Sequence, residues 1–229
     1  MIIHNVEQGT PEWLALRLGI PTASEFDNII TPAKGELSKQ SKGYAHRLIT
    51  ERVLRRSLDS LDHLEWIERG KMLEPDAARL YEFERDCETR KVGFITTDDG
   101  QLGASPDRLI VGHNGGVELK CPAPHTHIGY MLDGFGPAYK VQVQGQMLVG
   151  GFEFIDRVSY HPEMPPVIFR TWRDDAFIEL MRKALDEFND MLAEMERRVR
   201  DAGYFQERDR IMTIAEETYP DVATGEAGS

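Results

Sequence analysis

Residues 103–122 constrain the fold more than any other stretch of this chain. They place two short apolar runs on either side of a glycine-rich turn at residues 112–116. Apolar runs around an Asn-Gly-Gly turn predict an antiparallel hairpin. In its second strand, alternation should direct Val117 and Leu119 into the core. The segment therefore predicts a hairpin at the heart of a sheet.

The same hairpin carries charged residues at a meaningful spacing. Glu118 and Lys120 are two residues apart, so they should share one face of the strand, and Asp107 should come level with Glu118 across the turn. Carboxylates bind hard cations such as Mg²⁺, and a nearby lysine can orient water or stabilise charge on a phosphate. The alternative is a half-exposed strand with alternating polar residues. This is the one acid-x-Lys pattern in the sequence, which favours the metal-dependent phosphodiester chemistry.

Length and composition indicate an ordinary globular protein. The chain has 229 residues, 41% of them hydrophobic and 29% charged, so one domain with a sizeable core is expected. No apolar run is long enough to span a membrane, and the N-terminus lacks the pattern of a signal peptide. Cys87 and Cys121 lack metal-ligand spacing and are expected to be reduced thiols in a cytoplasmic protein.

The net charge of −12 is unevenly distributed. Residues 34–56 contain seven Lys or Arg against two Glu, whereas residues 174–229 contain fifteen Asp or Glu against seven Lys or Arg. A locally basic strip can bind a phosphate backbone even in an acidic protein. The alternative for residues 34–56 is a solvated helix face, and composition does not decide between the two.

The chain order predicts a mixed α/β (α+β) fold with a central mixed sheet flanked by helices. Helices are expected over 8–18, 20–30, 43–56, 64–86, 137–149, 174–199 and about 200–217. Strands besides the hairpin are expected over 91–96, 102–104, 152–160 and 167–172, with irregular loops over 31–42 and 123–136. We expect a single domain over 1–217 and a disordered tail over 218–229.

Two helices carry apolar stripes. The segment 64–86 should break near Gly70 or Pro75, and its stripe is expected in the core: Ala77, Leu80, Tyr81 and Phe83. The stripe of 174–199 is expected in the core or at a subunit contact: Phe177, Leu180, Met181, Ala184, Leu185, Phe188, Met191, Leu192 and Met195.

Several other polar residues have ordinary structural interpretations when taken alone. Arg17 suits the negative end of a helix, Ser24 suits a helix cap, and Glu74 suits a helix start. Gln142 would be a plain polar helix residue. His125 and His127 form a pair in a predicted loop, where exposure to solvent is more common than metal binding.

Four motifs in combination resemble a known group of enzymes. They are R-L-G-x-x-T-A-S-E from Arg17, G-K-x-x-E ending at Glu74, S-P-D with E-L-K-C-P around the hairpin, and Q-V-Q from Gln142. Over about residues 6–200 the chain resembles the PD-(D/E)xK nuclease superfamily, and within it the phage lambda exonuclease, or YqaJ-type viral recombinase, family. The resemblance implies a restriction-endonuclease-like core.

The resemblance also implies site residues. Metal would be held by Asp107, Glu118 and the Leu119 carbonyl, with Glu74 assisting. Lys120 would position the nucleophilic water, and phosphates would be held by Arg17, Ser24 and Gln142. The implied cofactor is Mg²⁺, two ions per site, with Mn²⁺ able to substitute. Departures from the lambda protein in loops 31–42 and 123–136 and beyond residue 200 bear on oligomer and partner contacts.

The implied activity is a 5′ to 3′ exonuclease that degrades one strand of linear double-stranded DNA and leaves a 3′ single strand for recombination by annealing. The implied partners are DNA ends, two further copies in a ring-shaped homotrimer, and a phage single-strand annealing protein. The setting would be the cytoplasm of a bacterium carrying the phage or prophage. In such a ring the basic strip would face the central hole. Two alternatives stay open: a structure-specific or restriction-type endonuclease on the same core, and a non-catalytic DNA-binding module.

Overall fold

The computed structural model describes residues 1–58 and 64–218. Its helices are α1 Pro11–Arg17, the 3-10 helix Ala23–Glu25, α2 Phe26–Ile29, α3 Ser41–Leu54, α4 Leu64–Arg85, α5 Pro124–Asp133, α6 Pro137–Gly150, α7 Asp175–Asp201 and α8 Tyr204–Thr218. Its strands are β1 Ile2–His4, β2 Thr89–Lys91, β3 Phe94–Thr96, β4 Gly103–Ala104, β5 Arg108–Ile110, β6 Gly115–Lys120, β7 Phe154–His161 and β8 Met164–Trp172. None of the described helices is long and apolar enough to cross a membrane.

The main sheet has five strands in the order β2-β5-β6-β7-β8. The predicted hairpin is confirmed as β5–β6, and β6–β7 is a parallel pair among antiparallel neighbours. A parallel pair needs a long crossover, which α5 and α6 provide. A second sheet joins the short strands β1, β3 and β4. The predicted mixed sheet flanked by helices is therefore confirmed.

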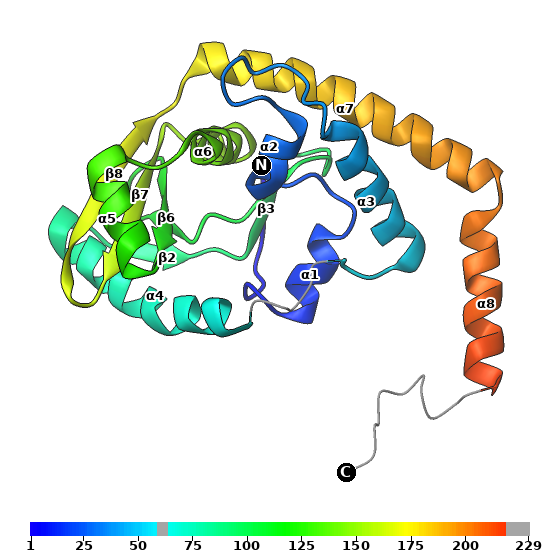
Figure 1. Cartoon of the computed structure of the whole chain (residues 1–229), viewed down its shortest axis with the longest axis horizontal. Helices are drawn as coiled ribbons and strands as arrows, with labels where there is room; N and C mark the ends of the chain where they lie inside the picture. The colour runs from blue at the N-terminus through cyan, green and yellow to red at the C-terminus, as the bar shows by residue number, and fades with distance from the viewer. Residues whose placement is uncertain (59–63, 219–229) are drawn as a thin grey trace.

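Helices cover both faces of the main sheet (Figure 1). On one face α4 packs through Ala77, Ala78 and Tyr81 against apolar side chains of β6 and β7, including Val117 and Leu119. The larger core lies on the other side, where α2, α3, α6 and α7 meet. Both faces of β6 are thus buried, which explains why even Glu118 is only 3% exposed.

The strand expected over residues 91–96 is instead two strands in different sheets. β2 pairs with β5, whereas β3 pairs with β1 and β4. Between them, the Gln8 side chain donates to the Val92 carbonyl at 2.8 Å and the Trp13 indole donates to the Gly93 carbonyl at 3.1 Å. These side chains take the place of the hydrogen bonds that a neighbouring strand would make. The chain can therefore leave one sheet and enter the other at this point.

Helix α4 differs from its prediction in two ways. It continues through Pro75 without the expected break, because packing of its buried face stabilises the turns on either side. Phe83 was expected in the core but is 82% exposed. Residues two apart on a helix differ by about 200° in direction, so Phe83 points away from the sheet when Tyr81 faces it. Leu80 lies between these extremes and is half-buried.

The loop expected over residues 123–136 contains α5, which Pro124 begins and Gly134 ends. At the other end of the sheet, the strand expected over 167–172 begins earlier, because β8 already starts at Met164. Its prolines, Pro165 and Pro166, are compatible with a strand because β8 lies at the edge of the sheet. The mostly polar loop over 31–42 is present, and α3 begins at Ser41.

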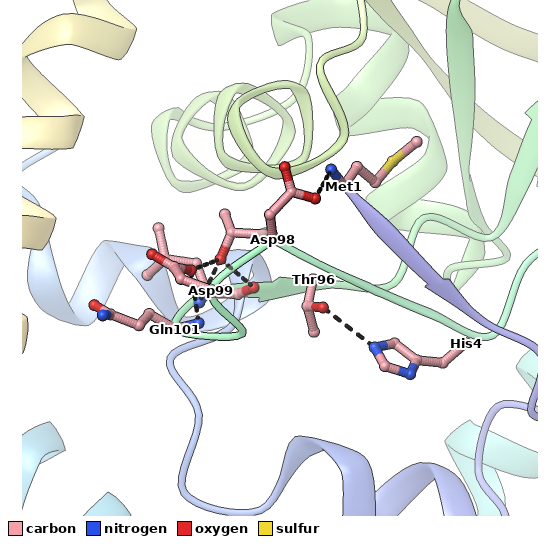
Figure 2. A network of polar contacts seen from close by, with 8 residues as sticks. Met1, His4, Thr96, Asp98, Asp99 and Gln101 are labelled. Carbon is pink, nitrogen blue, oxygen red and sulfur yellow. Dashed lines mark hydrogen bonds and ion pairs between the residues drawn. The ribbon is translucent and has the colours of Figure 1, made fainter.

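The chain terminus adds a strand that sequence patterns did not predict. β1 pairs with β3, and the Met1 ammonium contacts Asp98 at 2.5 Å in the turn after β3 (Figure 2). In the same turn Asp99 accepts hydrogen bonds from the Thr97 hydroxyl and the Gln101 N–H. Asp98 and Asp99 thus stabilise this turn and β1.

The two C-terminal helices are confirmed as α7 and α8. Gly203 separates them in a left-handed conformation, with φ of 80°. Phe188 of α7 stacks on Tyr44 of α3 at 5.8 Å. Leu180 departs from the predicted core stripe and is 44% exposed. Thr218 is the last residue of α8, and the rest of the tail expected over 218–229 lies outside the described residues.

Replacing Gly93 with alanine is expected to lower the free energy of unfolding by about 1–3 kcal/mol. The added methyl group would lie 2.0 Å from the Val6 carbonyl oxygen, a backbone atom that cannot rotate away. Urea unfolding measures the change. The matched control is Gly129→Ala in α5, where nothing lies within 4 Å and a gain of about 0.5–1 kcal/mol is expected. Equal stability of Gly93→Ala and wild type would contradict this account.

Candidate active site

The open end of the β5–β6 hairpin brings Asp107 to the second strand. The ladder pairs Arg108 with Val117, and the Asp107 N–H then donates to the Val117 carbonyl at 3.1 Å. Beyond that point β5 has no further pairing residue, and the Asp107 carboxylate accepts from the Leu119 N–H at 2.6 Å. The Asp107 side chain thus takes the place of a backbone hydrogen-bond partner of β6. This bond fixes the carboxylate beside Glu118, as the register of the hairpin predicted.

Glu118 is the centre of this cluster. Its Oε1 accepts hydrogen bonds from the Lys120 ammonium at 2.7 Å and the Gln142 amide at 2.8 Å. Its Oε2 accepts from the Gln146 amide at 2.7 Å. Three donors from β6 and α6 therefore converge on one buried carboxylate, which compensates for the loss of water around the charge.

The electrostatics of the cluster are dominated by burial. Burial and the neighbouring Glu118 charge raise the pKa of Asp107 well above its ordinary value, and Lys120 only partly opposes them. Burial acts to lower the pKa of Lys120, but the charges of Glu118 and Asp107 outweigh it and the pKa is raised. Lys120 is therefore a charged ammonium that offsets part of the repulsion between the two acids.

Glu74 lies at the margin of this cluster. Its carboxylate is 3.6 Å from the Lys91 ammonium, and its charge makes a smaller contribution to the raised pKa of Asp107. Within residues 1–58 and 64–218, no three His, Cys, Asp or Glu side chains lie close enough together to hold a metal ion. In this arrangement Glu74 contributes to the field around the two central carboxylates.

Arg17 and Ser24 lie beside the segment that leads to Asp107. The Arg17 guanidinium stacks on the Trp13 ring at 4.1 Å and reaches the Ser105 hydroxyl at 3.5 Å. It also donates to the Thr22 hydroxyl at 3.4 Å, and that hydroxyl contacts Ser24 at 3.2 Å. One short polar chain therefore links both predicted phosphate-binding residues to the segment between β4 and β5 that carries Asp107.

On α6, only some of the glutamines face the cluster. Gln142 does, as its motif implied. Gln144 instead joins α6 to the end of β8 and the start of α7, through the Trp172 carbonyl and the Asp174 N–H. Gln146 was missed, although its spacing of four from Gln142 places both on one helix face. Its Oε1 is buried and has no hydrogen-bond partner in the part of the chain that the structure describes.

His127 does not behave as the predicted loop residue. It lies in α5, is 2% exposed, and bonds the Ser159 hydroxyl at 2.7 Å and the Pro165 carbonyl at 3.0 Å. Both ring nitrogens are engaged in joining α5 to β7 and β8, so neither is available for a metal. His125 is exposed, as expected.

The basic strip over residues 34–56 is partly neutralised within the chain. Arg52 pairs with Glu196 of α7, and Arg55 pairs with Asp209 of α8 at 3.0 Å. Both acids belong to the acidic C-terminal region, which packs against α3. These two pairs lower the net charge of the strip, and the expectation that it faces DNA stays a prediction. Sequence distance hid the pairing, because charges about 150 residues apart meet only in the folded chain.

The match of residues 12–153 to the YqaJ-like viral recombinase domain defines the class of protein. These residues include the hairpin, Glu74, Arg17, Ser24 and the glutamines of α6. The chain belongs to the YqaJ-like viral recombinase family. No curated protein sequence matches it.

Several solved structures are similar to this chain. The alkaline exonuclease LHK-Exo from Laribacter hongkongensis superposes with a TM-score of 0.74 at 31% identity, covering 84% of this chain and 97% of that chain. The same enzyme in complex with dAMP matches with the same TM-score at 34% identity, covering 84% and 98%. A phage-related exonuclease from Haemophilus somnus 129PT shares the fold, with a TM-score of 0.59, 15% identity, and coverage of 77% and 96%.

Proposed function

We propose that this protein is a Mg²⁺-dependent exonuclease that degrades one strand of linear double-stranded DNA from 5′ to 3′. The observation that carries the proposal is the cluster in which Asp107, Lys120 and Gln142 converge on Glu118 at the open end of the hairpin. The family, and the relation to an alkaline exonuclease that has been observed with dAMP, support DNA as the substrate.

The donor set fits a hard divalent cation. Asp107 lies beside the buried carboxylate of Glu118, and desolvation together with the charge of Glu118 raises the pKa of Asp107. A cation would relieve the repulsion between the two acids. The Leu119 N–H points to Asp107. Its carbonyl shares that edge of β6, because N–H and C=O of one strand residue point to the same side. These three residues would hold the metal, two ions per site in our proposal, with Mn²⁺ able to substitute.

A bound metal would polarise the phosphate and supply an activated water. The protein's own residues position the other groups. Lys120 would orient that water and stabilise developing charge, Gln142 would donate to a phosphate, and Glu74 would add negative charge at the margin. Arg17 and Ser24 would bind a phosphate next to the reaction centre, where a guanidinium and a hydroxyl suit an anion.

We also propose two kinds of partner. One is further copies of the chain, in a ring-shaped homotrimer around DNA, and the other is a phage single-strand annealing protein that receives the 3′ strand. Because Arg52 and Arg55 are paired internally, the DNA path of such a ring would depend on other cations. Light scattering of the purified protein tests the trimer directly, since a monomeric mass would contradict it.

The activity is tested with linear duplex labelled at either the 5′ or the 3′ end, and with a covalently closed circle. We expect degradation of linear duplex alone, with Mg²⁺ and not with EDTA, and early release of the 5′ label while the 3′ label persists. Cutting of the closed circle would instead indicate the endonuclease. DNA binding without cleavage in Mg²⁺ or Mn²⁺ would indicate a binding module on the same fold.

A further inference from the structure

A half-buried arginine lies one strand away from the candidate active site. In the parallel pair β6–β7, Arg157 is the register partner of Glu118. Aligned residues on neighbouring strands point to the same face of a sheet. Arg157 therefore shares the face of Glu118 and Lys120, on the side of α5 and α6, whereas its neighbour Asp156 bonds Tyr81 of α4 on the opposite face.

No anion of the described chain balances Arg157. It makes no hydrogen bond or ion pair with any residue in 1–58 or 64–218, and its Nε is buried without a partner. Burial lowers the pKa of this guanidinium, yet an arginine stays protonated in proteins. Arg170, one strand away, contrasts with it, because two donors of Arg170 bond Asp156 at 2.8 Å. A desolvated cation without a partner lowers the stability of the fold. Binding of an anion to Arg157 would remove this cost.

Aromatic rings connect Arg157 to the candidate active site. Its guanidinium lies 4.8 Å from the Phe135 ring, which is 5.6 Å from the Tyr139 ring. Tyr139 in turn lies 5.6 Å from the Lys120 ammonium. On the outer side, Phe169 meets Phe135 edge-on at 6.2 Å and is 41% exposed. Aromatic rings interleaved with cations are what single-stranded nucleic acids bind, through base stacking and phosphate contacts.

We propose that Arg157 binds a backbone phosphate of the DNA strand beside the reaction centre, with Phe135 and Phe169 as the surface on which the adjoining base stacks. The inference rests on the proposed function, since it assigns a further contact to the same substrate. In this arrangement the DNA strand runs from Lys120 across β7 toward β8, past the rings of Phe135 and Phe169.

The test measures the affinity of a fluorescent linear duplex in EDTA, where no hydrolysis is expected, over a series of salt concentrations. Arg157→Gln should weaken binding about tenfold, because a charge-assisted hydrogen bond is lost. The slope of log affinity against log salt should become shallower by about 0.7–0.9, the value for one phosphate contact. Arg157→Lys should keep the wild-type slope, because the charge remains.

A structural role for Arg157 predicts different results. It would lower the melting temperature of Arg157→Gln without changing the salt slope, whereas our proposal expects a melting temperature equal to or above that of wild type, because an unpaired buried charge is removed. The control is Arg197→Gln on α7, which removes the same charge from an exposed arginine paired with Glu194 and Asp201. It should leave the slope unchanged.

The outcomes separate this inference from the proposed function. If wild type degrades linear DNA and Arg157→Gln keeps the wild-type slope, the phosphate contact is wrong and the nuclease assignment stands. If wild type neither binds nor degrades DNA, the proposed function fails and takes the inference with it.

Discussion

Replacing Lys120 with alanine is expected to slow degradation of linear duplex by about 10²- to 10⁴-fold. Among residues 1–58 and 64–218, Lys120 is the one cation bonded to Glu118, at 2.7 Å, and the charges of Glu118 and Asp107 both act on it. Without it, the proposed site loses the group that orients the water and one of the groups that stabilise charge on the phosphate. The measurement is the initial rate of nucleotide release from an end-labelled duplex at saturating Mg²⁺.

Loss of the fold must be separated from loss of chemistry. Gln142 and Gln146 still bond Glu118 in Lys120→Ala, so circular dichroism should show the wild-type helix content. The matched control is Lys183→Ala, which removes an exposed lysine paired with Glu179 on α7. It should leave the rate unchanged. A folded Lys120→Ala protein with the wild-type rate would remove Lys120 from the catalytic machinery.

Replacing Asp156 with alanine is expected to lower the free energy of unfolding by about 3 kcal/mol, near the lower end of the cost of breaking a buried ion pair. Asp156 is fully buried, and it accepts one hydrogen bond from the Tyr81 hydroxyl at 2.7 Å and two from Arg170 at 2.8 Å. Its loss would take one partner from the buried Tyr81 hydroxyl and the anion from the Arg170 guanidinium. The expected value is at the low end because the Arg170 side chain is 35% exposed and can partly rehydrate. Urea unfolding measures it.

An exposed pair of the same chemistry provides the control for Asp156. Asp209→Ala removes the partner of Arg55, in a pair whose side chains are 60% and 47% exposed. Exposed ion pairs contribute at most about 1 kcal/mol, so this variant should differ little from wild type. Similar losses for Asp156→Ala and Asp209→Ala would contradict the structural role assigned to Asp156.

Local pattern predicted the parts of the site that lie close together in the chain. The glycine-rich turn predicted the hairpin, and the two-residue period predicted that Glu118 and Lys120 share a face. The register of the hairpin also predicted that Asp107 comes level with Glu118. Each of these depends on backbone geometry over a few residues, which is why the sequence alone suffices. The roles of Arg17, Ser24 and Gln142 came from family resemblance and remain predictions.

Contacts between distant segments were decided only by the tertiary structure. Periodicity indicates which face of a helix or strand is buried, but not what it meets. It therefore could not show that Gln146 bonds Glu118, or that Arg52 is neutralised by Glu196. It also placed Phe83 in the core and missed the switch between sheets at Gly93, where side chains of Gln8 and Trp13 take the carbonyls. The sequence determined the hairpin and its charges, whereas packing across the sheet decided which partners those charges have, because burial forces each polar group to find a partner wherever the fold supplies one.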